Sequence, residues 1–448
     1  MNPSKNSQSN AICYEIQERA LKDLENSSEG QIEIRIQNTL SQFANITQDN
    51  IQDSILTPML MLRELLDECN ETEIGQILIQ FHSFFSIFFD IINNSAFQNT
   101  QLFSTTIDLV AFITDKLDFS SYQSFITADL FSNLSKLLQY NLNAIDIATN
   151  IFSEVEFENQ LLICNSFLPL LNFSSDSKFQ NKMAHFLYII IQYFHEIDQF
   201  FPQIADFFTT SLFTSDSNNN YYFSFYSIGK LIEKGHNINQ FLSSELLTVF
   251  NQCLHTKSEI VIKSLFYLIH TIVNQLYANQ DQQVHLFELF DYERIIQISF
   301  NDENEQKIRL RGLDVLISSA AFNSEMQSFL NGFNLIQMIQ FSFQQFSFKL
   351  QSNMCILYLN LIPRDDMQQR IQLLTIPLFA QILNLFDCFK DDVKSKILKI
   401  IVFTLRKSNL IGNKDFHHFL VEQKFHLTHN NQNTSCAEQR NNVNIYYK

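Results

Sequence analysis

The sequence predicts an all-α protein, built as a solenoid in which short helical units repeat along the chain. Glycine and proline are scarce, with 7 and 6 in 448 residues, although β-structures need such turn residues at every hairpin. Apolar residues recur at helical spacing in segment after segment. The segments return about every 40 residues, a period typical of stacked helical pairs or triplets, and a chain of this length is too long for one compact core.

The first two helices are expected at Ala11–Asn26 and Gln31–Ala44, where they cap one end of the array within residues 10–50. Residues 1–9 precede them as a polar segment without the apolar stretch of a secretory signal, and we expect them to be disordered.

Residues 75–92 read GQILIQFHSFFSIFFDII and carry no formal charge before Asp90. The stretch has polar residues at a spacing of four, three and seven positions, as expected along one edge of a helix: Gln76, Gln80, Ser83 and Asp90. Ile87 lies on the same edge and interrupts it. A membrane span needs about 20 predominantly apolar residues. We therefore interpret the stretch as one helix buried on most sides, and expect no transmembrane segment in the chain.

One helix of each later unit is expected around a buried Leu or Ile, which we call the anchor. The anchors are Ile107, Ile147, Leu187, Ile228, Leu265, Leu313, Ile356 and Leu398. Their steps run from 37 residues (Ile228 to Leu265) to 48 residues (Leu265 to Leu313). Three residues beyond each anchor lies another apolar residue, except at Asn150. The residue before the anchor is small in several units, as a close helix crossing requires: Thr106, Ser227, Ser264, Gly312 and Cys355.

A second helix is expected after most anchored helices. The expected second helices are Tyr122–Tyr140, Gln160–Leu171, Gln240–Leu254, Leu286–Phe300, Met326–Phe346 and Arg370–Phe389. The array thus spans residues 10–425, and the polar residues 426–448 are expected to form a disordered tail.

Residues 305–343, EQKIRLRGLDVLISSAAFNSEMQSFLNGFNLIQMIQFSF, resemble one armadillo repeat. Gly312, Leu313 and Leu316 match its small-Leu-x-x-Leu helix, and Gly332 matches the glycine that turns the chain into the last helix with a positive φ. The resemblance extends best from about residue 255 to 405. It implies a right-handed α-solenoid of armadillo-like two- or three-helix repeats of about 40 residues, and a fold used to bind proteins.

The chain departs from importin-type armadillo proteins, in which asparagine and tryptophan ladders hold a nuclear-localisation peptide. None of the eight matching positions here is asparagine, and the chain contains no tryptophan. A net charge of −17 argues against the basic groove of catenins and against nucleic-acid binding. We expect a protein or peptide partner whose identity the sequence does not specify.

Polar side chains recur along the second helices at the repeat spacing, and we call these six residues the polar row: Arg294, Gln297, Gln337, Gln340, Gln381 and Asn384. The resemblance implies that the last helix of each unit lines a groove. Amides can hydrogen-bond an extended peptide backbone without desolvating a charge. The row is therefore our hypothesis for the partner-binding site, and abundant glutamine at exposed positions is the alternative explanation.

No catalytic residue, cofactor site or metal site is predicted. The seven cysteines are scattered without CxxC or zinc spacing, as in reduced core residues of a cytoplasmic protein. His418, His426 and His429 match no standard zinc signature. No G-x-S-x-G motif is present. The acidic residues of one short segment are two positions apart, so they cannot lie on one face of a helix: Glu154, Glu156 and Glu158.

The sequence therefore predicts a cytoplasmic, non-enzymatic scaffold or adaptor. A regulator of a chaperone, of a GTPase or of the cytoskeleton is an alternative within the same class. A peripheral membrane protein is another, because Lys394, Lys396, Lys399, Arg406 and Lys407 form a basic run on one helix. An enzyme with a helical fold is a further alternative, disfavoured by the missing motifs.

Overall fold

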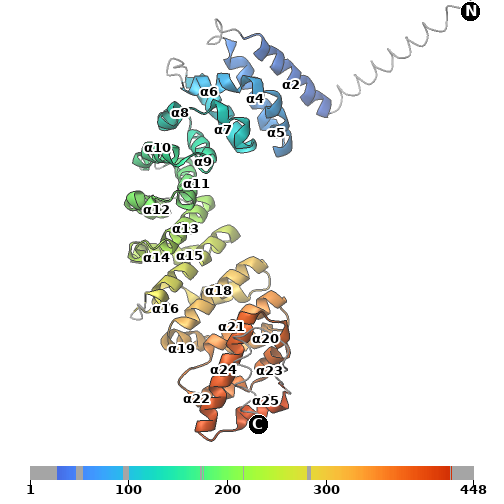
Figure 1. The fold of residues 1–448 in the computed structure, drawn as a ribbon, viewed down its shortest axis with the longest axis vertical. Coiled ribbons are helices and arrows are strands. Elements are labelled where there is room, and N and C mark those ends of the chain that lie inside the picture. Colours follow the sequence, from blue (N-terminus) through green and yellow to red (C-terminus); the bar gives the residue numbers. More distant parts are fainter. Residues whose placement is uncertain are drawn as a thin grey trace, which may run out of the picture. The chain divides into compact units, whose positions relative to one another are not determined.

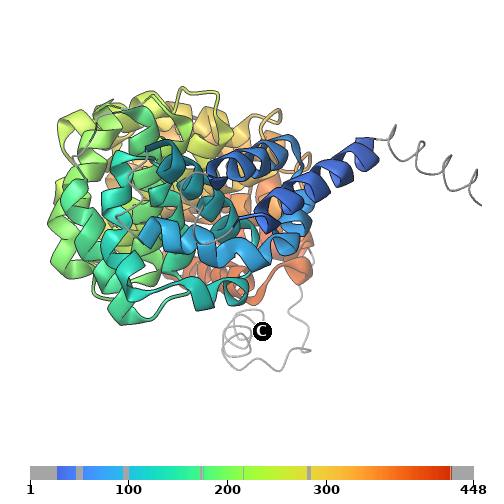
Figure 2. The same ribbon diagram turned by 90° about the horizontal axis from the view of Figure 1, so that it is seen from above.

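A computed structural model describes residues 28–46, 54–93, 100–171, 174, 176–214, 216–279, 284–423 and 425. All regular secondary structure in these residues is α-helix or short 3-10 helix, as the all-α prediction requires (Figure 1 and Figure 2). The chain divides into two compact units, 1–207 and 208–448. The expected helix Ala11–Asn26, residues 1–9 and residues 426–448 lie outside the described residues.

The helices of unit 1 form two layers. The α-helices are α2 (Ser28–Ala44), α4 (Leu56–Glu68), α5 (Glu71–Gln80), α6 (Phe85–Asn93), α7 (Thr100–Lys116), α8 (Ala128–Asn133), α9 (Ala144–Phe152), α10 (Phe157–Phe167) and α11 (Ser177–Tyr193), followed by α12 (Phe201–Thr214), which runs into unit 2. In one layer α4, α7, α9 and α11 pack one against the next. In the other, α6, α8 and α10 do the same. The predicted helix 31–44 is thus present as α2.

Unit 2 repeats a long helix followed by shorter ones. The α-helices are α13 (Asn218–Glu233), α14 (Ser244–Cys253), α15 (Glu259–Ala278), α16 (Leu286–Leu289), α17 (Tyr292–Phe300), α18 (Gln306–Phe322), α19 (Ser324–Gly332), α20 (Leu335–Ser342), α21 (Phe348–Leu361), α22 (Met367–Leu374), α23 (Pro377–Asn384), α24 (Asp391–Leu410) and α25 (Asp415–Glu422). The long helices α13, α15, α18, α21 and α24 stack in chain order and form the core layer.

The anchors are buried as predicted, with one exception. Seven of the eight have no exposed side-chain surface, whereas Ile356 is partly exposed and its neighbour Cys355 is fully buried. The predicted register of α21 is therefore wrong by one residue. The period alone did not determine which residue is the anchor, because three consecutive residues here are apolar: Cys355, Ile356 and Leu357.

Several expected second helices are broken into shorter elements. Met326–Phe346 is wrong as one helix: α19 and α20 are separated by Asn334, whose φ of +56° cannot continue a helix. The positive φ lies at Asn334 and not at Gly332, where the resemblance placed it. Arg370–Phe389 is likewise split into α22 and α23. Pro377 is the first residue of α23, a position that suits proline because the N–H it lacks would have no partner within the helix.

The other second helices also divide. Tyr122–Tyr140 contains α8 between 3-10 segments, and Leu286–Phe300 is divided into α16 and α17. Gln160–Leu171 ends as a 3-10 turn after α10, and Gln240–Leu254 begins with one before α14.

Residues 75–92 do not form a single helix. α5 ends at Gln80, a 3-10 turn follows, and α6 begins at Phe85, with a bend of 57° between the two parts. The predicted polar edge is exposed at all four positions, and Ile79 is 65% exposed beside it. Phe81, Phe85 and Phe88 are fully buried, so the phenylalanines pack between helices as expected.

In the described part of the chain, α15 is long and apolar enough to cross a membrane, and so are α5 and α6 if they form one bent span. However, α15 packs between α13 and α18, and 67% of its most apolar 18 residues are buried inside the protein. That packing is typical of the core helix of a helical layer.

Candidate functional site

The polar row lies on three short helices of unit 2, two residues on each of α17, α20 and α23. Gln297, Gln337 and Asn384 are exposed, and the other three are partly exposed. Within the described residues, the side-chain amides of Gln337, Gln340 and Asn384 form no hydrogen bond, so their donors and acceptors are available to a partner. Gln381 has a buried Oε1 without a hydrogen-bond partner.

Arg294 is held in place by neutral groups. Its Nε donates to the carbonyl of Leu254 at 3.1 Å, and its Nη1 donates to Oε1 of Gln297 at 3.3 Å. Its backbone N–H is capped by Oδ1 of Asp291 at 2.9 Å. These contacts fix the guanidinium at the N-terminal turn of α17 without pairing it with a carboxylate.

The start of α17 is tied to α14 by one asparagine. Nδ2 of Asn251 donates to the carbonyl of Leu289 at 3.1 Å, and Oδ1 of Asn251 accepts the N–H of Asp291 at 2.9 Å. Both bonds satisfy backbone groups in the short connection between α16 and α17. The position of Arg294 therefore depends on the packing of α14 against that connection.

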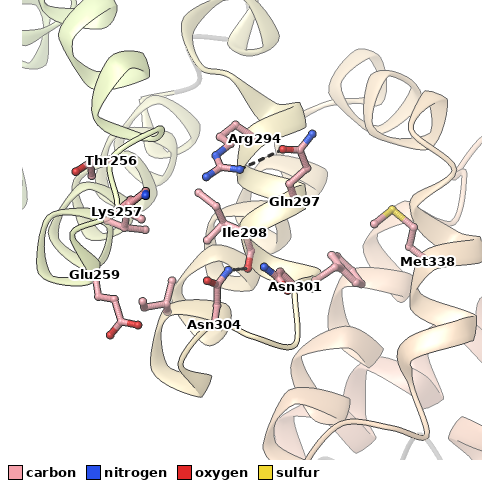
Figure 3. Close-up of a pocket in the computed structure, with 12 residues that line it drawn as sticks. Thr256, Lys257, Glu259, Arg294, Gln297, Ile298, Asn301, Asn304 and Met338 are labelled. Carbon is pink, nitrogen blue, oxygen red and sulfur yellow. Dashed lines mark hydrogen bonds between the residues drawn. The ribbon is translucent and has the colours of Figure 1, made fainter.

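A hollow of about 640 Å³ opens beside Arg294, and we call it the α17 hollow (Figure 3). It is lined by Thr256, Lys257, Glu259, Ile262, Arg294, Gln297, Ile298, Phe300, Asn301, Asn304, Ile308 and Met338. The start of α15 and the connection before it form one wall, α17 lies between, and Met338 comes from α20. Of the polar row, only Arg294 and Gln297 lie in this hollow.

The two asparagines of the hollow shape the turn between α17 and α18. Nδ2 of Asn304 donates to the carbonyl of Ile298 at 2.9 Å, and Oδ1 of Asn301 accepts the N–H of Glu303 at 3.1 Å. The other polar atoms of both side chains form no hydrogen bond within the described residues. The hollow therefore combines unused amide groups with a fixed cation.

The long helices of unit 2 carry a polar network that the sequence analysis missed. Nδ1 of His270 lies 3.3 Å from the carbonyl of Asp314 and 3.1 Å from Oγ of Ser318, while Nδ2 of Asn353 donates to Oδ1 of Asp314 at 2.9 Å. Burial raises the pKa of Asp314. These residues lie on α15, α18 and α21, and only their recurrence near the repeat period could have indicated that they meet.

Unit 1 has a smaller hollow of about 270 Å³ between α7, α9 and α11. Buried Asp108 forms an ion pair there with Arg63 at 2.9 Å and accepts a hydrogen bond from Asn143 at 2.8 Å. Asp146 pairs with Lys182, and burial raises the pKa of Asp146. The acidic groups already have partners, so this arrangement is explained by contacts between neighbouring helices.

The cysteines show why thiol chemistry is disfavoured. Burial raises the pKa of Cys164 and of Cys253 to about 12 and raises that of Cys355 further, so these thiols stay protonated at neutral pH. Cys388 is exposed. Cys13 and Cys436 lie outside the described residues.

The histidine and basic segments give no compact site. His418 is exposed on α25, whereas His426 and His429 lie outside the described residues, within which no group of three potential metal ligands comes together. In the basic run on α24, Lys394 is only 8% exposed and Lys396 donates to Oδ1 of Asn360. Two of the five cations are thus engaged inside the protein.

The sequence matches no protein-family model and no curated protein. A solved structure of an engineered protein resembles the chain with a TM-score of 0.67 and 12% identity, covering 92% of this chain and 98% of that one. A designed armadillo repeat protein matches with a TM-score of 0.40 and 15% identity, over 55% of this chain and 99% of that one. With its stacked helical units, the chain has an all-α solenoid fold, which it shares with the engineered protein.

Proposed function

We propose that this protein is a non-enzymatic cytoplasmic scaffold or adaptor, which binds a segment of a partner protein along the polar row. The observation that carries the proposal is the α17 hollow, where the guanidinium of Arg294 is fixed by neutral groups beside two unused amide atoms, Nδ2 of Asn301 and Oδ1 of Asn304. Free amides on α20 and α23 extend the same chemistry to the next two units. Such groups recognise an extended main chain without requiring a particular sequence.

The chemistry of the hollow favours binding over catalysis. Of the described residues that line it, none is a serine, cysteine or histidine, and the Thr256 hydroxyl accepts the N–H of Ser258 at 3.2 Å without a hydrogen bond to a side-chain base among the described residues. The similar solved structures are engineered or designed proteins whose names state no reaction. The membrane alternative has less support, because two of the basic residues on α24 are already engaged.

A library of random linear peptides tests the proposal on the full chain. Peptides retained by the wild-type protein are measured by fluorescence anisotropy against the double variant Gln337→Ala and Gln340→Ala. Losing two hydrogen bonds worth about 1 kcal/mol each weakens binding by roughly tenfold or more. The melting temperature should not change, because neither amide bonds to the protein itself.

The matched control replaces Gln344 and Gln345, two exposed glutamines just after α20, by alanine. This double variant removes the same atoms outside the polar row and should bind the peptides as the wild type does. A library from which the wild-type chain retains nothing contradicts the proposal. So do peptides whose binding is the same for both double variants.

A further inference from the structure

We propose that the α17 hollow binds the carboxylate of an aspartate or glutamate in the bound segment, with Arg294 as its partner. This inference rests on the proposed function, because the carboxylate belongs to the segment that lies along the polar row. It adds a requirement for one acidic side chain, which amides alone do not impose.

The guanidinium of Arg294 has N–H donors that its two hydrogen bonds do not use. A guanidinium has five N–H donors, and the two hydrogen bonds to Leu254 and Gln297 use two of them, which leaves three. Within the described residues Arg294 forms no salt bridge. By contrast, Arg63 pairs with Asp108 at 2.9 Å, and Arg309 stacks on the ring of Phe346 at 3.7 Å.

A guanidinium fixed at two points is preorganised for a carboxylate. Its remaining N–H groups can form two parallel hydrogen bonds to the two oxygens, a geometry that a lysine cannot provide. Because the Leu254 carbonyl and the Gln297 amide already hold the side chain, less rotamer entropy is lost when the ligand binds. Arg294 is therefore equipped as an anion receptor before any partner arrives.

The charges of the hollow favour a single negative charge. The residues that line the hollow carry two cations, Lys257 and Arg294, and one carboxylate, Glu259, so the lining itself has an excess of one positive charge. The two carboxylates just outside the lining already have contacts, Asp291 with His255 at 3.2 Å and Glu293 with the Gln297 amide at 3.3 Å. Figure 3 shows Lys257 on the wall beside Arg294, across the hollow from Met338. Asp291 and Glu293 lie on the same turn as Arg294 and would repel a dianionic phosphate more than a carboxylate.

The apolar lining suits the methylene groups of the acidic side chain. Ile262, Ile298 and Ile308 are buried residues of the lining, and Met338 is partly exposed beside them. An acidic side chain can cover this surface with its stem while its carboxylate meets Arg294. A free inorganic anion would gain nothing from that surface.

The test uses the full chain and the peptides retained by the wild-type protein. We expect an acidic residue at one position of the aligned peptides. Replacing that residue by its amide, Glu→Gln or Asp→Asn, should weaken binding to the wild type roughly tenfold or more, since a hydrogen-bonded charge is lost. The same replacement should matter less than about twofold for Arg294→Gln, because the partner of the charge is already absent.

Two further variants separate charge from geometry. Arg294→Lys keeps the charge but not the two parallel donors, so it should recover only part of the preference for the acid. Arg311→Gln is the matched control, because Arg311 is an exposed arginine on α18 outside the hollow, and it should keep the full preference. Equal melting temperatures of the variants show that differences in binding do not come from unfolding.

The outcomes distinguish this inference from the proposed function. Peptides that bind and depend on Gln337 and Gln340, but need no acidic residue, overturn the carboxylate and leave the scaffold standing. An acidic residue whose effect persists in Arg294→Gln overturns the role of Arg294. A phosphoserine peptide that binds more than tenfold tighter than its glutamate counterpart replaces the carboxylate by a phosphate. A wild-type chain that retains no peptide contradicts both proposals.

Discussion

Gly312 tests whether the predicted close helix crossing determines the stability of unit 2. It lies in the middle of α18, directly before the anchor Leu313, and α18 packs there against both α15 and α17. A Cβ at this position would overlap Oγ of Ser299 on α17 and lie 3.2 Å from its Cβ. It would also lie 3.1 Å from Cε2 of Phe266 on α15. We expect Gly312→Ala to destabilise unit 2.

The magnitude follows from two opposing terms. Alanine in the interior of a helix is favoured over glycine by roughly 1 kcal/mol. Overpacking a filled core by one methyl group costs about 1–3 kcal/mol. The Ser299 hydroxyl cannot rotate away freely, because it donates to the carbonyl of Ile295 at 2.7 Å, and the Ser299 Cβ cannot rotate away at all. The two terms leave a net loss of about 0–2 kcal/mol of unfolding free energy, and we expect the upper half, about 1–2 kcal/mol, because the overlap with Ser299 is not easily relieved.

Hydrogen exchange of the full chain measures this loss where it occurs. In a stacked array each unit is stabilised mainly by its neighbours, so amides of α17 and α18 should exchange faster while those of unit 1 do not change. A loss of about 1–2 kcal/mol corresponds to roughly 5- to 30-fold faster exchange. Ser299→Ala combined with Gly312→Ala should recover part of it, since the overlapping hydroxyl is removed.

Gly332→Ala is the matched control. Gly332 is the last residue of α19, has no positive φ and would bring its Cβ within 4 Å of no neighbouring atom. The same substitution should therefore leave exchange unchanged or slow it slightly. Equal exchange in the Gly312 variant and the wild type would show that the crossing of α17 and α18 is looser than the structure indicates.

Three further changes test buried polar groups in unit 2. Arg309→Met should leave the unfolding free energy measured in urea unchanged or raise it by up to about 2 kcal/mol, because Nε and Nη2 of Arg309 are buried without a hydrogen-bond partner. Methionine can keep the contact with the Phe346 ring, on which Arg309 stacks at 3.7 Å. Burial raises the pKa of Asp314 above its unfolded value of about 4. Between these two pKa values the folded state binds more protons than the unfolded state, so this carboxyl makes the wild-type protein less stable as the pH rises. Asp314→Asn should therefore reduce the decrease of melting temperature with pH in that range. Gln327→Leu should lower the free energy of unfolding measured in urea by about 2 kcal/mol, because the Gln327 amide donates to two carbonyls at the end of α21. An unchanged free energy of unfolding would contradict this role.

The layer of long helices could be predicted from the sequence because burial imposes a period on it. Anchors such as Leu265 and Leu313 are fully buried, and Asn150 is partly exposed at the one position where the pattern fails. The breaks between short helices could not be predicted in the same way. They depend on the backbone at single residues, and Gly332 was the expected site of a positive φ although Asn334 adopts it. Asparagine tolerates that conformation too, so composition alone does not decide between them.

The candidate site was predicted only in part, for a similar reason. Arg294 and Gln297 lie one turn apart, so helical spacing alone places them together in the α17 hollow. Lys257 and Met338 reach the same hollow from other elements, about 40 residues away on either side. Their arrival depends on how neighbouring units stack, which a local pattern does not specify.

Many Asn and Gln side chains of this protein hydrogen-bond its own backbone, and this separates them from the amides that are available to a partner. Several amides tie a helix to the backbone of a neighbouring connection: Asn331 donates to the carbonyl of Leu361 at 3.2 Å, and Gln351 donates to that of Phe343 at 2.8 Å. Such bonds satisfy carbonyls at the many helix ends of a chain made of short helices. An amide used in this way is not available to a partner. Gln337, Gln340 and Asn384 differ because their side chains make no bond within the described residues, which supports their assignment to the partner-binding surface.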